Sequence, residues 1–174
     1  MGIIRGMEPL TRAERTNYRE TSLHKDVLEF VQALRSKTEL MRVESMGQSG
    51  EGQEMPVLVF GASDPDDARR QGKPIVLVIS NILAGEVEGK ETLLMLAREM
   101  TLGSLGHYLN KLCLVFIPNY NPDGNDRISP ENRKLDLAQL EGQINPEGGV
   151  GTRYTGQGIN LNRDYMKLEA VESR

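Results

Sequence analysis

Ile75-Val76-Leu77-Val78-Ile79 is a continuous apolar run in which four of the five residues are β-branched. Gly72 and Pro74 stand just before it, so turn-forming residues bound the run. A continuous apolar run with such a boundary is typical of a strand buried on both faces of a sheet. We therefore predict a strand at 75–79 that is covered on both sides.

A helix and a second strand follow this run. Leu93, Ala97 and Met100 recur at helical spacing between Gly89 and Leu102, and Leu112 to Ile117 is again wholly apolar. A strand, a helix and another apolar strand in this order form a βαβ crossover, whose two strands are parallel. The sequence therefore predicts an α/β fold with a mixed, partly parallel sheet flanked by helices.

The segments before this crossover predict a helix and a pair of strands. Leu23 to Ser36 has amphipathic helical spacing, and the hydroxyls of Thr21 and Ser22 are candidate N-caps. Leu40 to Ser45 and Met55 to Phe60 predict two strands joined by a glycine-rich connection.

Three other stretches lack periodic apolar residues. The first twenty residues carry scattered charges, so we expect an irregular lead-in at 1–20 and one domain over 21–174. Residues 63–73 predict turn and surface structure, and residues 119–160, rich in Asn, Gly and Pro, predict a long loop region. Because that loop follows the carboxyl end of a sheet strand, it is where α/β folds tend to bind ligands.

The composition is that of a soluble globular protein. Apolar residues make up 38% and charged residues 26%, and the formal net charge is -4. The 21 basic residues are scattered among 25 acidic ones, which argues against a nucleic-acid partner. No segment has the character of a membrane span or a signal peptide, so we expect no membrane partner and leave the compartment open. The single cysteine, Cys113, excludes an internal disulfide and predicts a buried thiol.

Four motifs, in their order and spacing, resemble those of the zinc carboxypeptidases. They are Gly47 to Gly52, Asn81 to Lys90, Asn119-Tyr120-Asn121-Pro122-Asp123-Gly124, and Gly158-Ile159-Asn160-Leu161-Asn162-Arg163-Asp164. Each motif alone is weak, because Asn-Pro-Asp-Gly forms a turn wherever it occurs. The resemblance covers about residues 42–167. It implies the fold of that family and a hydrolase that removes C-terminal residues from peptides with zinc-activated water.

The sequence departs from the family pattern at the metal site. The resemblance implies a His-x-x-Glu pair after a strand, and here Leu83 stands at the histidine position and Glu86 at the glutamate position. A leucine has no lone pair to donate, so one zinc ligand is lost. If the two crossover strands are parallel, His107 lies at the opposite sheet end from Glu86, and we expect His24 to be solvent-exposed or capping.

The resemblance also implies a second zinc histidine and a catalytic glutamate base that come later than the Asn-Arg motif. The resemblance puts both well beyond the motif, and the sequence given ends at Arg174. We therefore expect a domain truncated at its C-terminal side, with weak or absent zinc binding and no hydrolysis by this chain alone.

The residues that hold substrate in the family are present. By resemblance, Asn162 and Arg163 match the pair that binds the terminal carboxylate of a peptide, and Arg153 matches the catalytic arginine that stabilises the developing oxyanion. The alternative is that both arginines are surface residues paired with carboxylates such as Asp164 or Glu147.

Two charged groups are expected to be structural. Asp126 and Arg127 predict a local ion pair, and Glu88, Lys90 and Glu91 predict the charged first turn of a helix.

Three functions stay open: a zinc carboxypeptidase, a zinc-free pseudo-enzyme that binds a peptide carboxylate, and a fragment that associates with itself through an exposed sheet edge.

Overall fold

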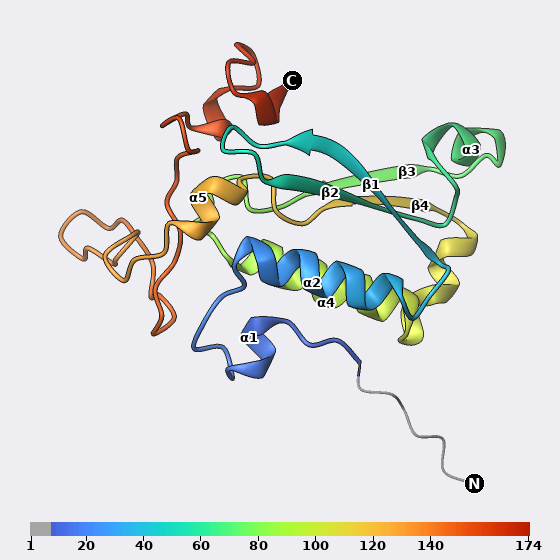
Figure 1. Ribbon diagram of the computed structural model, residues 1–174, viewed down its shortest axis with the longest axis horizontal. Helices are drawn as coiled ribbons and strands as arrows, with labels where there is room; N and C mark the ends of the chain where they lie inside the picture. Colours follow the sequence, from blue (N-terminus) through green and yellow to red (C-terminus); the bar gives the residue numbers. More distant parts are fainter. Residues whose placement is uncertain (1–7) are drawn as a thin grey trace, which may run out of the picture.

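The computed structural model describes residues 8–174, which form one four-stranded sheet with helices α2 and α4 side by side against one face (Figure 1). The strands are β1 (Met41–Gln48), β2 (Glu54–Phe60), β3 (Ile75–Ile79) and β4 (Cys113–Ile117). The α-helices are α1 (Arg12–Arg15), α2 (His24–Arg35), α3 (Pro65–Arg70), α4 (Glu88–Thr101) and α5 (Pro122–Asp126). Short 3-10 helices are η1 (Ser104–Asn110), η2 (Leu161–Arg163) and η3 (Val171–Ser173).

The sheet is mixed, with the strand order β1-β2-β4-β3. β1 and β2 form an antiparallel hairpin, and β2 is also antiparallel to β4. β3 and β4 are parallel, with Ile75 opposite Cys113 and Ile79 opposite Ile117. Helix α4 makes the crossover between them. The predicted α/β fold with a partly parallel sheet is therefore confirmed.

β3 is one of the two edge strands of this sheet and none of its residues is fully buried, so the prediction that it is buried on both faces is wrong. Val76 is 43% exposed and Leu77 is 55% exposed. An apolar run indicates a strand but does not fix its position in a sheet, because position depends on which strands pair with it. Within residues 8–174 no strand pairs with the outer edge of β3. Self-association through this edge stays a prediction.

The main core lies between the sheet and the two long helices. Phe60 of β2 and Phe116 of β4 meet with ring centroids 5.1 Å apart and an interplanar angle of 57°, a tilted geometry that aromatic pairs favour. Val27 and Leu34 of α2 and Leu94 of α4 are fully buried against them. The repeat of apolar residues that predicted both helices therefore marks the faces that pack on the sheet. In residues 8–174 no helix is both long and apolar enough to cross a bilayer.

The opposite face carries a smaller cluster. Cys113 is buried there with Val59 of β2 and Ala68 of α3, which confirms the predicted buried thiol. Helix α3 corrects the prediction of turn structure at 63–73. Its N-cap Asp64 accepts a 2.7 Å hydrogen bond from the Asp67 amide. This cap stabilises the first turn of a helix that is too short to show a repeat of apolar residues.

The lead-in is not irregular throughout. Thr11 and Glu14 form a capping box at the start of α1. The Glu14 amide donates to Thr11 Oγ1 at 3.2 Å, and the Thr11 amide donates to Glu14 Oε2 at 2.8 Å. Arg98 of α4 holds the Glu14 carboxylate in a fork with bonds of 2.8 and 2.7 Å. This bidentate pair fixes the segment to α4. The first seven residues of the predicted lead-in lie outside the described residues, and the domain boundary near residue 20 stays a prediction.

Candidate active site

The carboxyl ends of the parallel strands bring two sequence motifs together. β3 leads into the turn that holds Leu83 and Glu86, and β4 leads directly into Asn119. Asn81 has a positive φ of 58°, a conformation that asparagine tolerates better than most residues. Its Nδ2 donates to Asn119 Oδ1 at 2.7 Å and to Asn125 Oδ1 at 3.1 Å. These bonds tie the two strand exits to one another.

The Asn-Pro-Asp-Gly motif forms α5 rather than an isolated turn. Asn121 caps this helix by accepting a 3.0 Å bond from the Gly124 amide. Asp123 accepts bonds from Ser49 Oγ at 2.5 Å and from the Glu51 amide at 3.0 Å. The glycine-rich connection between β1 and β2 is thereby fixed to α5, so a third motif joins the same region.

Close backbone approach places Arg153 beside α5. The Thr152 amide donates to Gly124 O at 2.9 Å. A Cβ atom at Gly124 would lie 2.3 Å from Tyr154 O, and one at Gly151 would lie 2.4 Å from Gly124 O. Only glycine allows this contact, because a separation below 3 Å to a backbone oxygen requires the chain to move. The two glycines therefore position the segment that carries Arg153.

Glu86, the predicted metal ligand, pairs with an arginine. Its Oε1 accepts a 2.8 Å bond from Arg133 Nη2. Leu83 is buried, as its hydrocarbon side chain favours. Arg133 comes from the middle of the long loop and was not singled out in the sequence, because no local pattern marks an arginine that will meet a residue 47 positions away.

Neither histidine is placed to complete a zinc site. His107 lies in η1, before β4, while Glu86 follows β3, and the parallel pairing puts them at opposite sheet ends as expected. His24 is buried, which corrects the expectation that it is exposed or capping: its Nε2 lies 2.7 Å from Glu54 O. Among residues 8–174 no three His, Cys, Asp or Glu side chains gather as a metal site would need. The residues present do not fit a zinc ion.

Arg153 is half-buried and lines a polar cavity of about 360 Å³. Arg133 and Lys134 line the same cavity, together with Glu131, Asp136 and Glu141. Among the ion pairs of residues 8–174 none involves Arg153. Its guanidinium is thus available to an anion that enters the cavity.

Asn162 and Arg163 lie on η2 and are exposed. Arg163 Nη1 donates to Asn162 O at 2.9 Å. Asp164, a suggested ion-pair partner, instead accepts bonds of 2.9 Å from the amides of Glu169 and Ala170. Neither residue of the Asn-Arg pair lines the cavity of Arg153. Their role in carboxylate binding stays a prediction.

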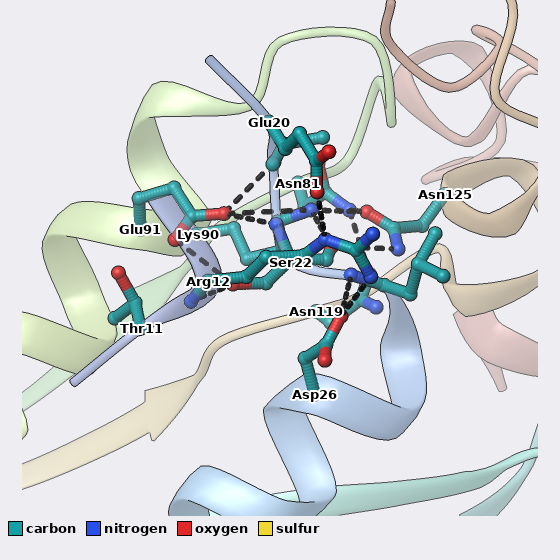
Figure 2. Close-up of polar contacts among 12 residues, drawn as sticks. Thr11, Arg12, Glu20, Ser22, Asp26, Asn81, Lys90, Glu91, Asn119 and Asn125 are labelled. Carbon is teal, nitrogen blue, oxygen red and sulfur yellow. Dashed lines mark hydrogen bonds and ion pairs between the residues drawn. The ribbon is translucent and has the colours of Figure 1, made fainter. Parts of the chain in front are cut away.

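Behind this region lies a buried polar network around the first turn of α4, which holds Glu88, Lys90 and Glu91 as predicted (Figure 2). Lys90 is 0% exposed, and its Nζ donates to Ser22 O and Asn125 Oδ1. Glu91 accepts bonds from Thr21 Oγ1 at 2.8 Å, Ser22 N at 2.6 Å and Ser22 Oγ at 3.0 Å. Burial lowers the pKa of Lys90 to about 8.

The start of α2 therefore differs from the prediction. The Thr21 and Ser22 hydroxyls donate to Glu91 instead of capping the helix. Asp26 takes the capping role, because its Oδ2 accepts a 2.8 Å bond from the Leu23 amide.

The network continues through three amides to His24. Lys90 donates to Asn125, Asn81 bridges Asn125 and Asn119, and Asn119 Nδ2 lies 3.0 Å from His24 Nδ1. Because Glu54 O can only accept, His24 Nε2 carries the proton and Nδ1 accepts from Asn119. Burial also lowers the pKa of His24, so the ring is held neutral.

Asp126 and Arg127 do not form the predicted local pair. Asp126 Oδ1 accepts from the His24 amide at 2.7 Å and from Asn125 Nδ2 at 2.8 Å. Arg127 pairs with Glu51 at 2.6 Å. Asp126 ends α5 and Arg127 is its C-cap, and the two adjacent side chains do not face one another, so each contacts a partner from a distant segment.

Comparison with known proteins gives the family of this fold. The family model for zinc carboxypeptidase matches residues 27–173. Human carboxypeptidase Z is 32% identical over 133 residues, which are 73% of this chain and 18% of the human protein. Caenorhabditis elegans carboxypeptidase E is 26% identical over 139 residues, which are 76% of this chain and 27% of that protein. The chain thus spans about a fifth to a quarter of the length of these relatives.

A solved metallo-carboxypeptidase from Burkholderia cenocepacia shares the fold, with a TM-score of 0.60 and 21% identity. The match covers 86% of this chain and 35% of the solved one. The fold, the four motifs and the family match agree, and the chain belongs to the zinc carboxypeptidase family.

Proposed function

We propose that this chain binds the C-terminal carboxylate of peptides and does not hydrolyse them by itself. The observation that carries the proposal is the pairing of Glu86 with Arg133, which lines the same cavity as Arg153, a residue with no ion-pair partner among residues 8–174. Zinc-dependent hydrolysis needs a metal held by about three protein ligands, whereas carboxylate binding needs only a guanidinium fork.

The cavity is large enough for the end of a peptide. Its volume of about 360 Å³ lies within the range of small-ligand sites. A planar guanidinium binds a carboxylate through two parallel charge-assisted bonds, which a C-terminal amide cannot form. Arg153, Asn162 and Arg163 are the residues proposed to hold the carboxylate.

Arg153→Gln is expected to weaken the binding of a short peptide about fivefold, as loss of a partly exposed charge pair usually does. Isothermal calorimetry with the peptide acid and its C-terminal amide measures the effect, and only the acid should lose affinity. Arg35→Gln, an exposed position at the end of α2, is the matched control and should leave both affinities unchanged. Equal affinity of the unaltered chain for acid and amide would contradict the proposal.

Leu83→His is expected to release no C-terminal residues from peptides. The substitution supplies one imidazole, so Glu86 and the new side chain give two protein donors where a catalytic zinc uses three. Chromatographic assay of released amino acids in the presence of added zinc measures the outcome, with the unaltered chain as control. Release that depends on both zinc and the histidine would show that the chain completes a hydrolytic site after all.

A further inference from the structure

Arg133 is held in a strained and supported position beside Glu86. Its backbone φ is +53°, a left-handed conformation that costs a residue with a side chain about 1–2 kcal/mol. Gln143 makes two hydrogen bonds with it. The backbone amide of Gln143 donates to Arg133 O at 2.8 Å, and the side-chain Oε1 of Gln143 accepts from Arg133 Nε at 3.3 Å. Strain that neighbours maintain is a feature of functional sites.

The Arg133 side chain also packs against Gly85, where a larger residue would collide with it. A Cβ atom at Gly85 would lie 2.2 Å from Arg133 Cδ and 2.8 Å from Gly151 O. Gln143 Nε2 donates to Gly85 O at 2.8 Å, so the loop is bonded to the turn that carries Glu86. The Arg133 side chain is only 19% exposed, compared with 49% for Glu86. Because Arg133 is mostly buried and is held by Gln143, the pair differs from an ion pair between two mobile surface side chains.

We propose that Arg133 is the built-in counter-cation of Glu86, and that it excludes divalent metal ions from this turn. In the zinc carboxypeptidase family, a metal ion binds the carboxylate at this position. Here the Arg133 guanidinium provides the positive charge instead. It occupies one carboxylate oxygen and repels a second cation that approaches the other. The inference rests on the premise of the proposed function that Glu86 holds no metal, but it concerns a different residue from Arg153.

Cobalt(II) titration tests this inference, because cobalt bound by protein ligands gives visible absorption bands. Leu83→His provides the reference, since a second donor next to Glu86 gives the ion a site to enter. Adding Arg133→Gln to this variant is expected to tighten cobalt binding about tenfold, as removal of an adjacent positive charge predicts. Glu86→Gln in the double variant should remove that gain.

The matched control is Lys134→Gln in the Leu83→His variant. Lys134 is the neighbouring cation and pairs with Glu131 at 3.2 Å, so its removal changes the net charge equally without freeing Glu86. Its cobalt affinity should stay at the reference value. Equal affinities with and without Arg133, or equal gains from Arg133→Gln and Lys134→Gln, would overturn the proposal.

Folding and function are separated by two further measurements. Thermal unfolding of each variant shows whether the loop change has altered the fold. Should Arg133→Gln prove unstable, Gln143→Ala offers a second route, because it removes the support of Arg133 and should give a smaller gain in cobalt affinity in the same direction. Peptide calorimetry with Arg153 variants tests the proposed function, and cobalt titration tests the role of Arg133, so either proposal can be contradicted without the other.

Discussion

Lys90→Met is expected to lower the free energy of unfolding by about 3–5 kcal/mol, the usual effect of removing one partner of a buried charge pair. Methionine has a similar length and leaves no large cavity, so the loss isolates the charge and its bonds. Without the ammonium group, the Glu91 carboxylate is buried with no counter-charge, and Ser22 O and Asn125 Oδ1 lose their donor. Urea denaturation measures the change.

Lys25→Met, on the exposed face of α2, is the matched control and should change stability by less than about 0.5 kcal/mol. Lys90→Met combined with Glu91→Gln should recover part of the loss, because the second change removes the uncompensated charge. A Lys90→Met protein as stable as the Lys25→Met control would show that the network contributes nothing to the fold.

Acidification below about pH 6.5 is expected to destabilise the protein through His24. Burial lowers the pKa of His24 in the folded state, so the unfolded chain binds this proton more readily. Stability from the neutral ring is therefore complete above the unfolded pKa of about 6.5 and is lost as the pH falls through the folded pKa. The slope for one proton cannot exceed about 1.4 kcal/mol per pH unit.

The charged groups around His24 act in both directions. Asp126 and Asp123 favour the imidazolium and Lys90 opposes it, but burial is the largest influence. A protonated Nδ1 would also face the amide donor of Asn119, so the bond between them would break. Urea denaturation between pH 7 and about pH 5 measures the slope before most carboxylates titrate.

The second histidine of the chain is the control for this slope. His24→Gln should flatten the dependence of stability on pH, although the variant starts from a lower stability. His107→Gln, at an exposed position in η1, should retain the dependence of the unaltered protein. If the slope persists in His24→Gln and disappears in His107→Gln, the prediction is wrong, because His107 and not His24 then binds the proton.

Elements with strong local periodicity could be predicted from the sequence. The helix expected at Leu23 to Ser36 is α2, the one expected at Gly89 to Leu102 is α4, and the apolar run at Leu112 to Ile117 contains β4. Each of these patterns repeats over a distance that the backbone geometry itself sets. Helices α1 and α3 escaped prediction because helices of four and six residues are too short to repeat such a pattern.

Burial of charged residues could not be predicted. Lys90 and Glu91 have the composition of an exposed helix start, yet the chain before α2 and the helix after β4 cover them. Asn81 after β3, and Asn119 and Asn125 after β4, supply the amides that make this burial tolerable. Their clustering depends on the meeting of two strand exits, which adjacent residues in the sequence do not encode.

At the candidate site, the sequence by itself determined the chemistry that is available. Leu83 cannot donate to a metal and Arg153 can bind an anion whatever the fold, because these are properties of the side chains. Only the tertiary structure decided which charge Glu86 meets, since Arg133 reaches it from a loop 47 residues away along the chain. Electrostatic partners are set by distance in space, and that distance follows from packing, from the parallel strands and from the glycines at 85, 124 and 151.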